Sequence, residues 1–348
     1  MIARLYDEIF LTHGVSWHPE NAERLRAIIR RLEENGLWYE LAPLEFEAAD
    51  WERLAWVHEE VYLEELEAAS RAGGEAFDAD TIATAGTWEA ARRAAGACME
   101  GAEAVVGSVD LQALCVVRPP GHHARRGQAM GFCFLNNAAL AAEAARRAGA
   151  ARVAIFDIDC HHGNGLQEIF YARGDVLYAS IHEREIFPGT GTVDELGIDA
   201  GLGLNVNVPL PEGARGEHYL RAWDELLEPV IRRFAPELLI LDAGYDAHWR
   251  DPLSGMALQA GDYHALGGRA RALAAEVCAG RVQVILEGGY DPEALALSVE
   301  NTILALRGEP IQEEDEPAPA GHPVQLGRVE EYLQHAIETH RGRLGIVG

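Results

Sequence analysis

The chain contains the stretch Asp157-Ile158-Asp159-Cys160-His161-His162-Gly163-Asn164-Gly165, which directly follows an apolar run at residues 152–156. β-Branched and aromatic residues in such a run predict a buried strand. Acids, imidazoles and glycines at its end predict an exposed turn that carries hard metal ligands. Open parallel α/β sheets bind their ligands beyond the carboxyl ends of their strands. The stretch therefore predicts a metal site at that edge of an α/β sheet.

Other apolar runs end in the same way at polar residues, and helix-like segments rich in Ala, Arg and Glu lie between them. Such alternation is typical of a parallel sheet covered by helices. We expect a single three-layer α/β domain, with a central, mostly parallel sheet and helices on both faces. The further strands are expected at 113–117, 176–181, 238–241 and 282–286, and helices at 16–35, 87–107, 138–149 and 216–234.

The length of 348 residues allows two domains, but α/β folds of this size often form one. We expect a catalytic domain at 1–310. Past Pro310 the composition shifts to an acidic Pro/Ala stretch, at 313–320, typical of a linker. A helix at about 324–340 follows. The segment 311–348 is thus predicted to pack on the domain or to form an interface in a homo-oligomer.

The composition argues against several classes of protein. No apolar run reaches the length of a membrane helix, and the N-terminus lacks the pattern of a secretory signal, so no membrane association is expected. The five cysteines are scattered, which argues against disulfides or a thiolate zinc site and fits a cytoplasmic protein. A formal charge of -27 makes nucleic acid an unsuitable partner; it would attract cationic substrates, or it serves solubility alone.

Three residues at strand ends form the candidate metal site. Residues two apart in extended backbone face the same side, so Asp159 and His161 can address one ion. Asp246, after another buried strand, can supply a third ligand. One imidazole with two carboxylates and an open position is a hydrolytic type of zinc site, and it also suits Fe2+.

Two further motifs suggest acid/base chemistry. His122 and His123 lie on a turn braced by proline and glycine, and imidazole titrates near neutrality. Asp157 and Asn164 are available to orient them. Tyr290 follows two glycines after a buried strand, where it can donate its hydroxyl to an oxyanion. In isolation, the histidine pair is also compatible with a surface or metal-binding role, and a tyrosine at a strand end is most often a packing residue.

Together these motifs resemble the histone deacetylase superfamily, which has an arginase-like α/β fold and includes bacterial deacetylase-like amidohydrolases and acetylpolyamine amidohydrolases. They occur in the family's order from residue 13 to about 305. The matching stretches are His18-Pro19-Glu20, 118–124, 131–137, 157–165, 187–191, Asp246 with 251–253, and 287–290.

The resemblance implies a role for each matching residue. A catalytic zinc, one per chain, is held by Asp159, His161 and Asp246. His122 and His123 form an acid/base pair oriented by Asp157 and Asn164 respectively, and Tyr290 polarises the acyl carbonyl. Gly131, Phe132 and Phe187 wall an acyl-lysine channel with Leu253 near its mouth, and Asp80, or less well by spacing Asp78, binds peptide. A structural K+ is held around Asp157, Asp159, His161 and Ser180, while His162 is a buried structural residue.

The resemblance also implies the reaction. Water attacks the amide carbonyl after giving its proton to the histidine pair, and the leaving amine is protonated by His123. Asn164 and the strings around Tyr290 are similar to class II and bacterial members. N-ε-acyl-lysine of proteins or peptides is the expected substrate, with acetylpolyamine as the alternative because of the acidic charge. An arginase-type ureohydrolase with two Mn2+ ions and a non-catalytic acyl-lysine binder are more distant alternatives.

Overall fold

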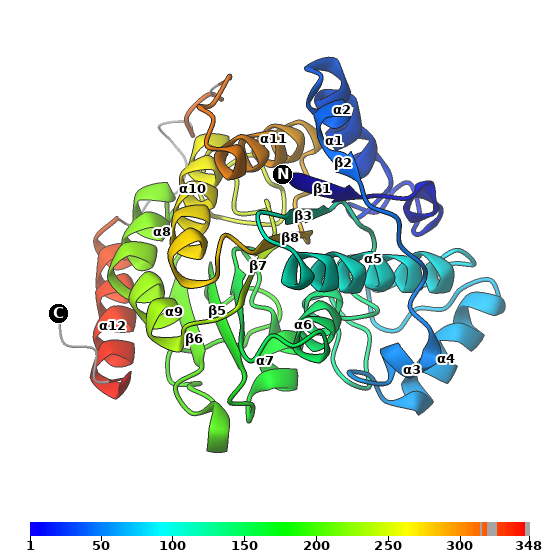
Figure 1. Ribbon diagram of the computed structural model, residues 1–348, viewed down its shortest axis with the longest axis horizontal. Coiled ribbons are helices and arrows are strands. Elements are labelled where there is room, and N and C mark those ends of the chain that lie inside the picture. The colour runs from blue at the N-terminus through cyan, green and yellow to red at the C-terminus, as the bar shows by residue number, and fades with distance from the viewer. Residues whose placement is uncertain (314, 319–325, 345–348) are drawn as a thin grey trace.

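The computed structural model describes residues 1–313, 315–318 and 326–344 (Figure 1). Within them the chain builds one eight-stranded sheet in the order β2-β1-β3-β8-β7-β4-β5-β6, and every pairing between these strands is parallel. The strands are β1 Ile2–Leu5, β2 Ala42–Pro43, β3 Gln112–Cys115, β4 Val153–Asp157, β5 Val176–Glu183, β6 Asn205–Leu210, β7 Leu238–Ala243 and β8 Val282–Leu286. The predicted fold class is confirmed, and the sheet is entirely parallel.

Strand β4 fixes the place of the site. All five of its residues are buried, because β5 and β7 flank it and helices cover both its faces. In register, its last residue, Asp157, faces Ser180 of β5 and Asp242 of β7. These three polar residues are therefore neighbours across the sheet, and the loops after the three strands start from one edge.

Helices cover both faces of the sheet (Figure 1). On one face α5 and α6 contact β3, β8, β4 and β7, and on the other α10 contacts β7 and β8 and packs against α11, which in turn packs against α1. The longer helices are α1 Glu23–Glu34, α4 Glu60–Arg71, α5 Thr87–Gly107, α6 Asn137–Arg147, α10 Ala260–Val277, α11 Pro292–Arg307 and α12 Leu326–Leu344; the shorter ones are α2 Leu37–Glu40, α3 Trp51–Leu54, α7 Asn164–Phe170, α8 Gly216–Ala222 and α9 Glu228–Phe234.

Two predicted helices differ from those observed. The helix expected at 16–35 begins only at Glu23, because residues 16–22 form turns in which the Asn21 amide donates to the carbonyl of His18 at 2.6 Å. The helix expected at 216–234 is interrupted by a π-helical turn, Trp223–Leu227. Pro229 follows this turn and has no N–H for the α-helical bond to the carbonyl four residues earlier, which accounts for the change of helix type.

The C-terminal helix α12 lies beside β6 and α8 (Figure 1). Val329, Leu333, Ala336 and Ile337 are buried on its inner face, and Nε2 of His340 donates to the carbonyl of Asn207 at 2.9 Å. Residues 324 and 325 of the predicted helix lie outside the described residues. A domain boundary at 310 and a homo-oligomeric interface stay predictions. In the described part of the chain, no helix has the length and apolarity to cross a membrane.

Among the buried side chains, His58 gives the fold a pH dependence that can be measured. Its Nδ1 donates to the carbonyl of Arg125 at 3.0 Å, and its Nε2 accepts from the backbone N–H of Asn136 at 3.0 Å. The neutral ring thus satisfies both partners, and a second proton would face the N–H of Asn136. Burial lowers the pKa of His58 to about 4.

We expect His58 to make the protein less stable in mild acid. The unfolded chain takes up a proton on His58 below about pH 6.5, whereas the folded protein does so only near pH 4. Stability from this group is therefore complete above pH 6.5 and falls by about 2 kcal/mol between pH 7 and 4.5. The check is urea unfolding of wild type and His58→Gln at both pH values. Equal losses of stability in the two proteins would contradict the assignment.

Candidate metal and acid/base site

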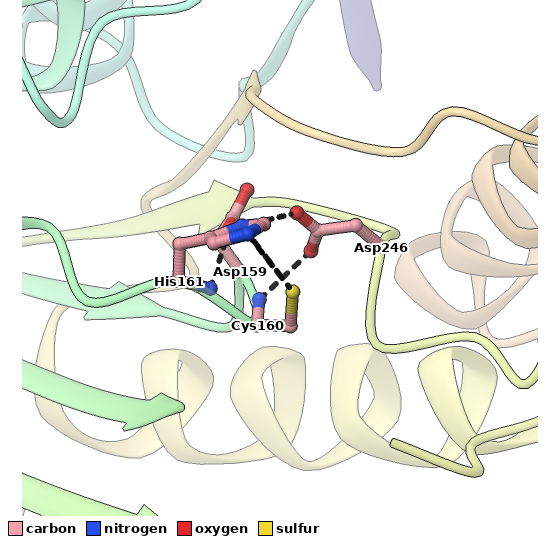
Figure 2. A group of neighbouring side chains, drawn as sticks. All are labelled: Asp159, Cys160, His161 and Asp246. Atoms are coloured by element: carbon pink, nitrogen blue, oxygen red, sulfur yellow. Dashed lines mark hydrogen bonds and ion pairs between the residues drawn. The ribbon is translucent and has the colours of Figure 1, made fainter. Parts of the chain in front are cut away.

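The three predicted metal ligands converge at the carboxyl edge of the sheet. Nδ1 of His161 lies 3.1 Å from Oδ1 of Asp159 and 2.9 Å from Oδ2 of Asp246. Asp159 and His161 follow β4, while Asp246 comes from the loop after β7, and Figure 2 shows the side chains turned toward one another. Both carboxylates are buried, and the imidazole is 12% exposed. The structure thus brings the three residues together, and their role as ligands stays a prediction.

Main-chain donors orient the two carboxylates. Asp246 Oδ1 accepts from the N–H of Cys160 at 2.8 Å, and Asp159 Oδ2 accepts from the N–H of Gly288 at 2.9 Å. A Cβ on Gly288 would lie 2.6 Å from that same oxygen, and one on Gly244 would collide with the Asp159 carboxylate. The two glycines therefore let the loops after β7 and β8 approach the acids closely.

The charges at this cluster fit a cation. Burial raises the pKa of Asp159, but His122 and His161 outweigh it and hold that pKa below its usual value. Burial and Asp159 together raise the pKa of Asp246. Ligand atoms of Asp159, Cys160, His161 and Asp246 all lie within 4.8 Å of one another. Two carboxylates and an imidazole nitrogen at such spacing are a donor set that suits Zn2+ or Fe2+.

Cys160 was not expected in this group. Its Sγ lies 3.3 Å from Nδ1 of His161 (Figure 2). Burial, together with Asp246 and Asp159, raises the pKa of the thiol well above its usual value, which favours the protonated form. Its position between two predicted ligands was the available signal, but residues alternate sides along an extended strand, and that argument pointed Cys160 away.

The tandem histidines lie beside the cluster and make the expected contacts. Nδ1 of His122 donates to Oδ2 of Asp157 at 3.1 Å, and Nδ1 of His123 donates to Oδ1 of Asn164 at 2.8 Å. Burial lowers the pKa of His122, but Asp159 and Asp157 raise it to about 10. Burial, His122 and His161 lower the pKa of His123 well below its usual value. The surroundings therefore favour the cationic form of His122 and the neutral form of His123.

Two further buried acids stand behind His122, and the sequence argument gave them no role. Glu287 accepts from the N–H of Gly121 at 2.6 Å and of His122 at 3.2 Å, which fixes the histidine turn. Asp242 lies within 4.8 Å of His122 and Asp157, and neither of its oxygens has a hydrogen-bond partner among the described residues. Burial and Glu287 raise the pKa of Asp242 well above its usual value. Their places at the ends of β8 and β7 were the signal.

Aromatic rings stand next to the catalytic candidates. The Phe132 ring lies 5.8 Å from the ring of Tyr290, and the Phe187 ring lies 5.0 Å from that of His123. Burial raises the pKa of Tyr290 well above its usual value, so its hydroxyl remains a donor. Gly131 carries a φ of +57°, and its missing side chain leaves room for the His123 and Phe187 rings. These residues thus lie next to the catalytic candidates, and their role as walls of an acyl-lysine channel stays a prediction.

The remaining candidates are more peripheral. Leu253 and Phe187 are 37% and 43% exposed. Asp80 is exposed, and its carbonyl accepts from Nε2 of His18 at 3.0 Å; the His18 ring in turn contacts Phe132. His162 is buried and faces away from the cluster, with its nitrogens near Thr190 and Gln167, as expected for a structural residue.

Comparison with known proteins shows which family this chain is similar to. The family model described as histone deacetylase domain matches residues 18–306. A protein named "Probable deacetylase" from Archaeoglobus fulgidus is 40% identical over 308 residues, 87% of this chain and 86% of that protein. A "Histone deacetylase-like amidohydrolase" from Pseudomonas aeruginosa is 40% identical over 275 residues, 78% of this chain and 72% of that one. The solved HDA15 HD domain superposes with a TM-score of 0.88 at 33% identity, covering 99% of this chain and 98% of that one.

We expect Gly131→Ala to destabilise the protein at this site. The added Cβ would collide with the His123 ring and lie 2.8 Å from Cε1 of Phe187, at a φ that non-glycine residues rarely adopt. A loss of about 1 to 3 kcal/mol in the free energy of unfolding should follow. Gly268→Ala is the matched control, because its Cβ meets nothing within 4 Å in helix α10 and the change should be neutral or stabilising. Equal stability of the two variants would refute the crowding argument.

Proposed function

Since the chain belongs to the histone deacetylase family and is thus an amide-hydrolysing enzyme of deacetylase type, we propose that it is a zinc-dependent hydrolase of N-ε-acyl-lysine in proteins or peptides. The observation that carries the proposal is the convergence of the Asp159–His161–Asp246 cluster with the tandem histidines. Nε2 of His122 lies 3.9 Å from Asp159 Oδ1, so an acid/base group is next to the proposed ion. No group of this proposed machinery is missing from the chain.

Asp159, His161 and Asp246 would hold the ion, one per chain. When bound, zinc supplies Lewis-acid polarisation of an acyl carbonyl and lowers the pKa of water. Fe2+ suits the same ligands, and the metal used in the cell is a matter for analysis of the purified protein. We also propose a structural K+ near Asp157 and Ser180, which are neighbours in register on β4 and β5.

His122 and His123 have different roles in the proposed proton transfers. Burial and the positive charges of His122 and His161 lower the pKa of His123, and Asn164 accepts its Nδ1–H, so Nε2 is free to accept a proton from the attacking water. The same imidazole then returns that proton to the leaving amine nitrogen, which completes release of a carboxylate and a free amine. Asp157 holds the proton on Nδ1 of His122 and keeps its Nε2 toward the cluster. The Tyr290 hydroxyl donates to the developing oxyanion.

The side chains around the site are the basis for the proposed substrate class. In this proposal, an acyl-lysine side chain lies between the Phe132 and Phe187 rings, and Asp80, whose side chain is exposed, accepts from peptide N–H groups. The second candidate is an acetylpolyamine, which the net charge of -27 favours. The ureohydrolase alternative is not carried further, because the family matched over residues 18–306 is the deacetylase family.

Tyr290→Phe tests the proposed oxyanion donor. Loss of the hydroxyl removes an interaction made mainly in the transition state, so kcat on an acetyl-lysine peptide should fall about 10²-fold with little change in KM. Metal content and the free energy of unfolding should match wild type, since the structure records no hydrogen bond of this hydroxyl within the described residues. A variant with full turnover would remove Tyr290 from the mechanism.

A comparison of two substrates tests the proposed substrate class. We expect kcat/KM for an acetyl-lysine peptide to exceed that for N-acetylputrescine, because only the peptide offers backbone N–H groups to Asp80. Asp80→Asn should raise KM for the peptide and leave the small amine unaffected. A preference for N-acetylputrescine that survives Asp80→Asn would favour the polyamine alternative.

A further inference from the structure

Acidic residues that follow helix α11 lie against the loop that carries Asp246. Glu313, Asp315 and Glu316 line a groove of about 660 Å3, whose other walls include Arg31 of α1, and His248 and Trp249 of the loop after β7. Arg31 binds Glu313 at 2.9 Å, and the Trp249 indole donates to the carbonyl of Glu316 at 2.9 Å. The segment is therefore fixed on both sides of Asp315.

Both carboxylate oxygens of Asp315 accept hydrogen bonds. Oδ2 accepts from Nε2 of His248 at 2.6 Å, and Oδ1 accepts from the N–H of Ala260, the first residue of α10, at 3.1 Å. The Asp315 side chain is 13% exposed and that of His248 is 1% exposed. A carboxylate at the first turn of a helix is also favoured by the helix dipole. Asp315 thus joins the loop after β7 to the start of α10.

His248 links Asp315 to the main chain of the loop after β7. Its Nδ1 accepts from the N–H of Arg250 at 3.1 Å, so the ring proton lies on Nε2. This Nε2–H donates a hydrogen bond to Asp315. The carbonyl of His248 accepts from the N–H of Asp251 at 2.8 Å. Because the ring is buried, loss of Asp315 would leave Nε2–H without a partner, which is costly and would favour a rearranged loop.

The same loop carries two groups of the active site. Asp246 lies two residues before His248, and its carboxylate contacts Nδ1 of His161 at 2.9 Å. Three residues after His248, Asp251 accepts from the N–H of Tyr290 at 2.6 Å. A shift of this loop would therefore move a proposed metal ligand and the support of the proposed oxyanion donor together.

We propose that Asp315 is a positioning residue for the active site: by holding His248 and the start of α10, it fixes the loop that places Asp246 and supports Tyr290. Asp315 touches neither ion nor substrate, and it acts through His248. The inference rests on the proposed metal site for its effect on metal affinity, but its effect on the loop is independent of any metal. The C-terminal segment is in this way part of the catalytic unit.

The first experiment compares Asp315→Ala with Glu313→Ala in the full chain. Both changes remove an acidic contact of the same segment, but only Asp315 contacts the loop, while Glu313 is 64% exposed and pairs with Arg31. Competition with a chelator gives the Zn2+ dissociation constant. We expect Asp315→Ala to weaken Zn2+ binding about 10-fold or more, as for other residues that orient metal ligands, and Glu313→Ala to stay within about twofold of wild type. Equal effects of the two changes would overturn the proposal.

A second experiment separates this proposal from the metal proposal. Amide hydrogen exchange in the metal-free protein should become faster at residues 247–251 and at Tyr290 in Asp315→Ala but not in Glu313→Ala. Should wild type bind no Zn2+, the metal proposal fails, and this comparison still decides the inference. The isosteric Asp315→Asn covers any failure of the alanine variant to fold; it keeps one acceptor and should fall between wild type and alanine. Unchanged exchange in both Asp315 variants would refute the positioning role.

Discussion

The negative charge buried at the carboxyl edge of the sheet is the main constraint on the loops that surround the site. Asp157, Asp159, Asp242, Asp246 and Glu287 are fully or almost fully buried there. Isolated carboxylates are very costly to bury, so each needs a cation, an imidazole, a main-chain N–H or its own proton. The structure supplies all but the cation from its own groups, and a divalent ion is the remaining compensation that the Asp159–His161–Asp246 geometry suits.

This constraint explains why so many loops meet at one place. The N–H groups of Cys160, Gly121 and Gly288 are directed at carboxylates, and each comes from a turn that follows a different strand. Such donors are preorganised by the fold, so they need no rearrangement during a reaction. The C-terminal segment extends the same principle, since Asp315 satisfies a buried imidazole of the loop that supplies Asp246.

Much of the fold followed from short-range patterns. The apolar runs at 152–156, 238–241 and 282–286 predict strands because buried parallel strands are continuously apolar, and each run overlaps a strand of the sheet. Strand β6 was missed, since its Asn205 and Asn207 are polar yet buried. Their amides both donate to Gln167, a partner 38 and 40 residues away, and no local pattern can reveal such a contact.

The α/β class, the strands that end in acids and histidines, and the candidate metal ligands follow from hydrophobic periodicity and from the chemistry of neighbouring residues in the chain. The folded structure was needed to show that Cys160 joins the cluster, that Glu287 and Asp242 lie behind His122, and that Asp315 contacts His248. Apart from the contact of Cys160 with the adjacent His161, these contacts join residues far apart in the chain. Their existence depends on strand order and loop closure, which fix distances in space that spacing along the chain does not contain.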